Sequence, residues 1–268
     1  MNQYGMLVDL PKCIGCRGCQ VACKQWNDKP AEVTRNTGSY QNPPRLSSKT
    51  STLVEFREVE TVDKLSFVFV KRQCMHCLHP GCATACTVGA LQKRPDGPVV
   101  YDATKCIGCR YCMYACPFGV PRFEWDKQLA LIEKCELCVD RLDAGEKPAC
   151  AKTCASGAIQ FGQREELLTI ARERVYAKNS PYVKHIYGEE EVGGTTWMYL
   201  SVVPFEQLGF PKLPEGTPVY INDKIMHATP TIALGMGLAL SGIYWMINRR
   251  IRIQDRILAE NGNHLEEK

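Results

Sequence analysis

Sixteen cysteines, grouped in four sets of four, constrain this chain more than any other feature. Two sets share the spacing C-x2-C-x2-C-x3-C, and both open with the peptide Lys-Cys-Ile-Gly-Cys-Arg. The other two sets vary this spacing by one longer gap before the third cysteine. In chain order the sets are Cys13, Cys16, Cys19 and Cys23; Cys74, Cys77, Cys82 and Cys86; Cys106, Cys109, Cys112 and Cys116; and Cys135, Cys138, Cys150 and Cys154. No cysteine is left over, so the fold must bring groups of thiols together.

The repeated spacing indicates cubane iron-sulfur clusters. Three cysteines at i, i+3 and i+6 let a short glycine-containing loop curl around a cluster, and the fourth cysteine reaches a neighbouring cluster. Zinc prefers two separated C-x2-C pairs that close one tetrahedron. A disulfide framework is typical of short secreted domains. We therefore predict four 4Fe-4S clusters with all sixteen cysteines as ligands, and we expect the chain to carry electrons.

A second internal repeat supports duplication. Residues 80–90 read Pro-Gly-Cys-Ala-Thr-Ala-Cys and lead to Gly-Ala, and residues 148–158 read Pro-Ala-Cys-Ala-Lys-Thr-Cys and lead to Gly-Ala again. Self-similarity of this kind indicates a repeated structural unit. We predict an α+β fold in which residues 1–160 form duplicated ferredoxin-like modules, with an insertion at residues 24–73.

The insertion begins polar and proline-rich and then becomes strand-like. Residues 53–59 alternate between apolar and polar side chains, and residues 65–70 are mostly apolar, which predicts a β-hairpin. Two roles stay open for it, a surface decoration and a docking face for a partner, because long insertions in compact domains are often functional.

Residues 161–226 are predicted to form an extension that packs on the cluster domain. Within residues 164–178, Leu167, Leu168, Ala171 and Val175 fall on one face of a helix, as in an amphipathic packing helix. A strand-like run at residues 195–203 follows a Gly-Gly pair.

An uncharged segment at residues 228–248 predicts one transmembrane helix, with bounds near 227–250. About 20 residues at about 1.5 Å each span the roughly 30 Å hydrocarbon layer. Thr229 and Pro230 suit an N-cap and a first helical position, and Tyr244 and Trp245 suit an interfacial belt. The alternative is a buried helix in a soluble core.

The charges that flank this segment predict its orientation. Arg249, Arg250 and Arg252 follow it and outweigh the basic residues on the other side. By the positive-inside rule, the tail at residues 251–268 is cytoplasmic and the cluster domain lies on the outer, periplasmic side of the cell membrane. Residues 1–10 lack the features of a secretory signal, so we expect export together with a partner that bears one.

Small residues in the segment recur at helical spacing, Gly235 with Ala239 and Gly237 with Ser241. Such pairs let a second helix approach closely, which predicts a membrane partner, although glycine is also simply tolerated in lipid. None of the five histidines lies within the segment, so a haem held by this helix alone is not expected. His227 at its edge is either an interfacial polar residue or a contact to a haem or quinone held by a partner.

The remaining chemistry of the sequence is sparse. The net charge of +4 comes from scattered residues, without the basic stripe that binds nucleic acid. There is no nucleotide-binding glycine motif, no Ser-His-Asp set and no cysteine free to act as a nucleophile. His76 and His79 are candidates to donate hydrogen bonds to cluster sulfurs. We expect a non-catalytic electron-transfer subunit of an oxidoreductase complex.

Several longer motifs point to a family. They are Cys-Met-His-Cys at residues 74–77, Cys-Arg-Tyr-Cys-Met-Tyr-Ala-Cys-Pro-Phe-Gly-Val-Pro at 109–121, Cys-Glu-Leu-Cys-Val-Asp-Arg at 135–141, Trp-Asn-Asp at 26–28 and Gly-Gly-Thr at 193–195. With these motifs the chain resembles the four-cluster β subunits of molybdopterin oxidoreductases, and among them the iron-sulfur subunits of respiratory formate dehydrogenases of the nitrate-inducible type. Related membrane-bound nickel-iron hydrogenases, which have a similar subunit, are the alternative. A sensory or structural module is disfavoured because it would need only one cluster.

The resemblance implies which cysteines share a cluster and which partners the chain has. It implies a hetero-oligomeric complex in which a large catalytic subunit of the molybdopterin or nickel-iron type supplies electrons, and a membrane cytochrome b or quinone-binding subunit receives them. The implied ligand groups are Cys13, Cys16, Cys19 and Cys154; Cys23, Cys135, Cys138 and Cys150; Cys74, Cys77, Cys82 and Cys116; and Cys86, Cys106, Cys109 and Cys112.

Overall fold

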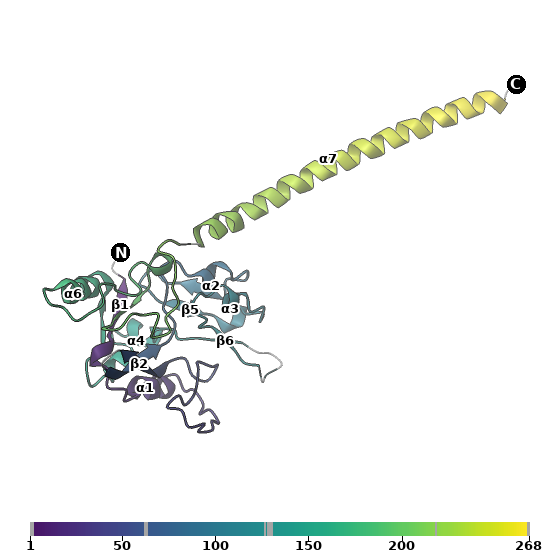
Figure 1. The fold of residues 1–268 in the computed structure, drawn as a ribbon. Helices are drawn as coiled ribbons and strands as arrows, with labels where there is room; N and C mark the ends of the chain where they lie inside the picture. Colours follow the sequence, from purple (N-terminus) through teal and green to yellow (C-terminus); the bar gives the residue numbers. More distant parts are fainter. Residues whose placement is uncertain (1–2, 62–63, 126, 128–130, 218, 267–268) are drawn as a thin grey trace. The chain divides into compact units, whose positions relative to one another are not determined.

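The computed structural model describes residues 3–61, 64–125, 127, 131–217 and 219–266 (Figure 1). The chain divides into two compact units, Met1–Val219 and Tyr220–Lys268. The first unit contains every cysteine, and the second is formed by one long helix.

A three-stranded sheet forms the centre of the first unit. Strand β1 (Tyr4–Asp9) lies between β8 (Ile159–Gln163), to which it is antiparallel, and β9 (Trp197–Leu200), to which it is parallel. Because β1 precedes the first cysteine and β8 follows the last, the sheet joins the two ends of the cysteine-rich region. Strand β8 therefore crosses residue 160, where we place a domain boundary; that boundary stays a prediction.

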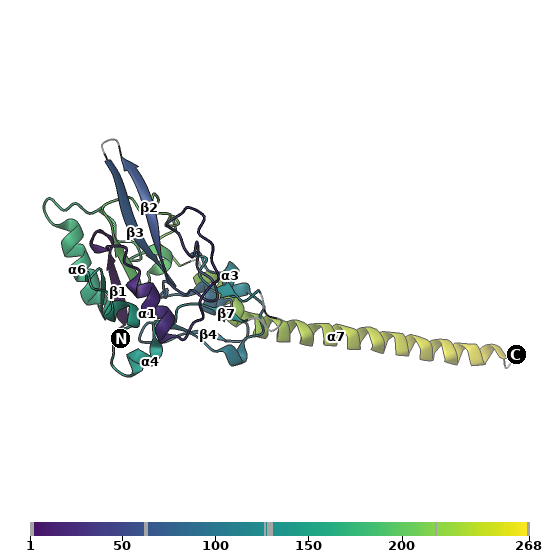
Figure 2. The ribbon, with the colours of Figure 1, turned by 90° about the horizontal axis from the view of Figure 1, so that it is seen from below.

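The two faces of this sheet enter different parts of the core, as alternating side chains must. Met6, Val8, Trp197 and Tyr199 join the larger hydrophobic cluster, which also holds the base of the hairpin. The opposite face packs against helix α6 (Arg164–Tyr176), which lies beside β1 in Figures 1 and 2.

Helix α6 confirms the predicted amphipathic helix. Leu167, Leu168, Ala171 and Val175 are all buried and pack with Leu7 of β1. The helix ends at Tyr176, two residues before the predicted end.

The predicted β-hairpin is also present and is longer than expected. Strands β2 (Leu53–Thr61) and β3 (Lys64–Arg72) pair antiparallel, with Phe56 opposite Phe69. These two rings lie 4.9 Å apart and edge to face. Figure 2 shows the two strands running side by side away from the central sheet.

The cysteine-containing loops are separated by short helices and two-stranded ladders, with β4 pairing β5 and β6 pairing β7. Their bounds are η1 (Leu10–Lys12), α1 (Gly18–Trp26), α2 (Gly81–Thr84), β4 (Leu91–Lys93), β5 (Val99–Tyr101), η2 (Ala103–Lys105), α3 (Tyr111–Tyr114), β6 (Arg122–Phe123), β7 (Ile132–Glu133), α4 (Val139–Asp143), α5 (Ala149–Lys152) and η3 (Glu191–Gly193).

The sequence repeat is matched by a repeat of backbone conformation. Gly15 and Gly108, at the same position of the two C-x2-C-x2-C-x3-C runs, both have φ of 68°. Arg17 and Arg110, two residues later, have φ of 57° and 65°. Left-handed residues turn the chain sharply, so both runs form the same loop.

Helix α7 (Val219–Glu266) begins at the last residue of the first unit and forms the described part of the second. Its segment Ala228–Leu258, with mean hydropathy 1.4, is long and apolar enough to cross a membrane, and its side chains are not buried within the protein. The helix continues past Arg249 and Arg250 as far as Glu266.

The predicted start of this helix at Thr229 and Pro230 is wrong. The helix begins at Val219, and Pro230 lies inside it. The Thr229 hydroxyl donates a hydrogen bond to the carbonyl of Ile225 at 2.7 Å. Proline is tolerated within membrane helices, where neighbouring groups and local adjustments of the backbone satisfy the hydrogen bond that it removes. The Thr229-Pro230 pair therefore lies within the helix and does not cap its start. The His227 side chain lies outside the described part of the structure.

Candidate metal centres

The structure gathers the cysteines into groups that combine distant parts of the sequence. In the first group, Cys154 joins Cys13, Cys16 and Cys19 around one cavity. The pairing of β1 with β8 brings these cysteines together, because β1 ends just before Cys13 and β8 begins just after Cys154.

The second group lines a neighbouring cavity. Cys23, from the end of helix α1, faces Cys135, Cys138 and Cys150. Two contacts hold α1 against the later segment: the Trp26 indole N–H donates to the Asp140 carboxylate at 2.8 Å, and the guanidinium of Arg141 lies 4.2 Å from the centre of the Trp26 ring.

The other two groups are identified by which cysteines shift the pKa of a given thiol, because only nearby charges do so. Burial and then the charges of Cys74, Cys116 and Cys82 raise the pKa of Cys77. Burial and then Cys86, Cys106 and Cys109 raise the pKa of Cys112 to about 11. The third group is thus Cys74, Cys77, Cys82 and Cys116, and the fourth is Cys86, Cys106, Cys109 and Cys112.

The four groups adjoin one another in a series. Cys19 of the first group acts on the pKa of Cys150 in the second. Cys74 of the third group acts on Cys135 of the second, and Cys112 of the fourth acts on Cys82 of the third. The first group therefore adjoins the second, the second adjoins the third, and the third adjoins the fourth.

The thiols fit a metal cluster better than a single ion. All sixteen are free of disulfides. Zinc would need its thiolates about 2.3 Å from one point, and within the described ranges no three His, Cys, Asp or Glu side chains are arranged to hold one ion. Burial raises the pKa of Cys23, Cys82 and Cys150 to about 12, so these thiolates require a bound metal to compensate their charge.

Hydrogen bonds to sulfur surround these groups, and no motif in the sequence predicts them. Asn27, next to the Trp26 contact, directs its amide N–H to Cys23 Sγ at 3.6 Å. The backbone donors are the N–H groups of Ala90 to Cys86, Gly108 to Cys106, Leu137 to Cys135 and Ile159 to Cys154, at 3.2–3.4 Å. Such bonds set cluster potentials.

The two histidines between Cys74 and Cys82 differ in their surroundings. His76 is fully buried, and its Nδ1 accepts the Val99 N–H at 2.9 Å. Burial and then Lys134 and Lys93 lower its pKa well below 6.5, so it is neutral with the proton on Nε2. Nε2 is buried without a partner among the described atoms, and its donation to a cluster stays a prediction. His79 is exposed.

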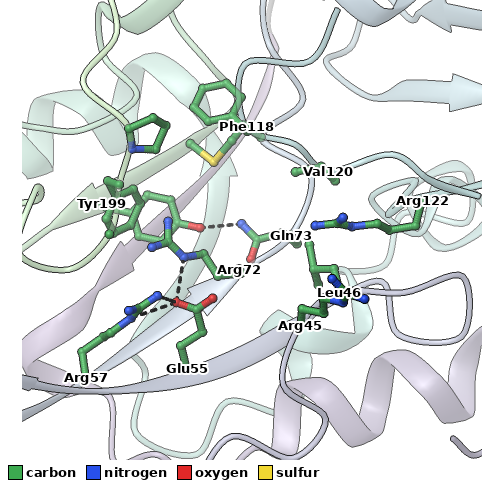
Figure 3. Close-up of a pocket in the computed structure, with 14 residues that line it drawn as sticks. Arg45, Leu46, Glu55, Arg57, Arg72, Gln73, Phe118, Val120, Arg122 and Tyr199 are labelled. Carbon is green, nitrogen blue, oxygen red and sulfur yellow. Dashed lines mark hydrogen bonds and ion pairs between the residues drawn. The ribbon is translucent and has the colours of Figure 1, made fainter. Parts of the chain in front are cut away.

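A basic pocket lies beside the third group. Arg57 and Arg72 both bind the Glu55 carboxylate, at 2.7 and 3.2 Å (Figure 3). The pocket is also lined by two further guanidinium groups and two neutral polar side chains, those of Arg45, Arg122, Gln73 and Tyr199. Its apolar lining includes Met75, Phe118 and Val120, which flank the cysteines of the third group. The pocket thus places positive charge near that group.

Comparisons with known proteins identify iron-sulfur domains in this chain. Two models described as 4Fe-4S dicluster domain match residues 12–90 and 65–164. The chain is 43% identical to the nitrate-inducible formate dehydrogenase iron-sulfur subunit of Escherichia coli over 80% of this chain and 74% of that protein. It is 39% identical to the formate dehydrogenase iron-sulfur subunit of Haemophilus influenzae over 90% and 79%. It is 34% identical to the hydrogenase-2 operon protein HybA of E. coli O157:H7 over 94% and 86%.

Proposed function

Because this chain belongs to the family of formate dehydrogenase iron-sulfur subunits, we propose that it passes electrons from a formate-oxidising catalytic subunit to a cytochrome b in the membrane and so to quinone. The chain carries four 4Fe-4S clusters and is an electron-transfer subunit of a hetero-oligomeric complex, without a reaction centre of its own.

The observation that carries this proposal is the series of four adjoining thiol groups. A cluster in each group would lie next to the one before it, so an electron could move stepwise through the first unit. In our proposal each cluster is held by one group: Cys13, Cys16, Cys19 and Cys154; Cys23, Cys135, Cys138 and Cys150; Cys74, Cys77, Cys82 and Cys116; and Cys86, Cys106, Cys109 and Cys112.

The proposed membrane arrangement rests on α7. In this arrangement the segment Ala228–Leu258 crosses the bilayer once. Arg249, Arg250 and Arg252 favour a cytoplasmic carboxyl end by the positive-inside rule, and the cluster-bearing unit then lies on the outer side. The Gly235 and Gly237 positions permit a close helix from the cytochrome partner. Labelling of a cysteine introduced in place of Glu267 in intact cells, with no labelling expected before lysis, tests the orientation.

The function is tested on the complex purified from membranes in mild detergent. We expect formate to reduce a quinone analogue through this complex and hydrogen to be without effect. Reduction by hydrogen alone would assign the chain to a hydrogenase, the alternative favoured by its similarity to HybA. Reduction by neither donor would contradict both assignments.

A further inference from the structure

Lys71 of strand β3 is a buried cation whose direct partners are all neutral. The residue is 2% exposed. Its ammonium donates to Thr52 Oγ1 at 2.5 Å and to Gln73 Oε1 at 3.0 Å, and it lies 4.6 Å from the centre of the Trp197 ring. Among the described residues no carboxylate forms an ion pair with it. A buried charge without compensation is costly.

The surroundings of Lys71 are built to accept its protons. The Thr52 hydroxyl donates to the carbonyl of Arg72 at 3.1 Å, which leaves its lone pairs for the ammonium. The Gln73 amide nitrogen donates to the Tyr199 hydroxyl at 2.5 Å (Figure 3), which turns the amide oxygen toward Lys71. Tyr199 in turn donates to the Lys71 carbonyl at 2.9 Å. The side chain is thus fixed as a charged donor.

The first two thiol groups are the candidates for a counter-charge to Lys71. Lys71 lines the cavity of the first group and the cavity of the second. The Lys71 side chain therefore borders both cavities.

We propose that Lys71 is the shared counter-charge of the first two clusters and that it raises the reduction potentials of both. Each thiolate ligand adds negative charge, and a cluster becomes still more negative when it accepts an electron. A fixed cation in a dry environment stabilises the reduced form more than the oxidised form, and local charge is one of the factors that set cluster potentials. One side chain thus tunes two neighbouring clusters together.

The inference rests on the proposed ligand groups, and potentiometric titration of the whole purified complex tests it. Electron paramagnetic resonance signals of the first two clusters are assigned beforehand from Cys16→Ser and Cys138→Ser. In Lys71→Met we expect the reduction potentials of the first and second clusters to fall, and those of the third and fourth clusters to shift less. Lys71→Arg keeps the charge and should stay close to the unmodified complex. Lys105→Met, which removes an exposed lysine before Cys106, is the matched control and should leave the first two potentials in place.

The iron content and absorbance of each variant show whether its clusters have been assembled. Loss of the first two clusters in Lys71→Met but not in Lys71→Arg would also support the proposal, because the charge is then required for assembly. Fully loaded Lys71→Met with unchanged potentials would overturn it. Loss of clusters in both variants would overturn it too, since the position would then serve packing. The titration uses a chemical reductant, so failure of formate to act as donor is a separate result.

Discussion

The carbonyl of Gly194 accepts a hydrogen bond from the N–H of Leu78 at 2.9 Å, and the next residue, Thr195, forms a β-bridge with Cys77. The Gly-Gly-Thr motif of the extension therefore holds the loop that carries Cys77 and Cys82. A motif far from any cysteine in the sequence thus supports the third thiol group.

Gly194→Ala should loosen this loop. Gly194 has φ of 92°, and an added methyl would lie 2.9 Å from the Glu189 carbonyl oxygen and 3.0 Å from Leu78 Cδ1. We expect a loss of about 1–3 kcal/mol in unfolding free energy, with lower occupancy of the third cluster, as measured by denaturation and iron content. Gly119→Ala is the control: it has φ of 59° but open space around it, so it should keep the third cluster. Equal iron content in both variants would contradict the role of Gly194.

His185 and Glu191 predict a pH-dependent stability. Their side chains meet at 2.5 Å, and this hydrogen bond to Glu191 raises the pKa of His185 above 6.5. A raised pKa means that the stabilisation is complete below pH 6.5 and is lost as the pH rises through the folded-state value. The Glu191 side chain is buried but His185 is about half exposed, so solvent screens the pair and its contribution is roughly a few tenths of a kcal/mol. In thermal unfolding, the unmodified chain should have a higher melting temperature than His185→Gln. This difference in melting temperature should be largest near pH 6.5 and should vanish at alkaline pH. A gap that widens with pH would refute this.

Trp26→Ala should weaken the second thiol group. The change removes the indole hydrogen bond to Asp140 and the stacking of Arg141, which together contribute about 1–2 kcal/mol. We expect lower stability and an altered signal of the second cluster, measured by denaturation and by paramagnetic resonance. Gln25→Ala, on an exposed position of the same helix, is the control, and an equal effect of the two changes would argue against the contact.

Cys106→Ser should interrupt the electron path. Loss of a proposed ligand of the fourth cluster breaks the series, so formate-driven quinone reduction should fall to a small residual level. Reduction of an artificial dye by the catalytic subunit should remain. Met113→Leu, a volume-conserving change beside Cys112, should leave both activities nearly intact. Undiminished quinone reduction in Cys106→Ser would count against the path.

The sequence predicted the elements that depend on local pattern. The cysteine spacings, the hairpin and helix α6 could all be recognised because period, spacing and turn residues are properties of short segments. The parallel pairing of β1 with β9 joins residues almost two hundred positions apart, and no local pattern reports such a pairing.

The role of Lys71 escaped prediction for a related reason. In the sequence it is one basic residue at the end of an apolar strand, next to Arg72, and most lysines in such places are solvated. Its burial depends on Trp197 and Thr52, which different segments supply. The start of α7 was misplaced because a Thr-Pro pair is a capping signal only where the preceding residues are not helical.

The pairing of β1 with β8 has a consequence for the order of events during synthesis. The third and fourth thiol groups draw only on residues 74–116, whereas the first and second wait for Cys150 and Cys154. When residue 116 has left the ribosome, the third and fourth thiol groups thus have all their cysteines, while the first and second groups still lack some of theirs. The cysteines that are synthesised first therefore belong to the groups that are completed last. Until then the cell must keep these thiols reduced and free of other metals.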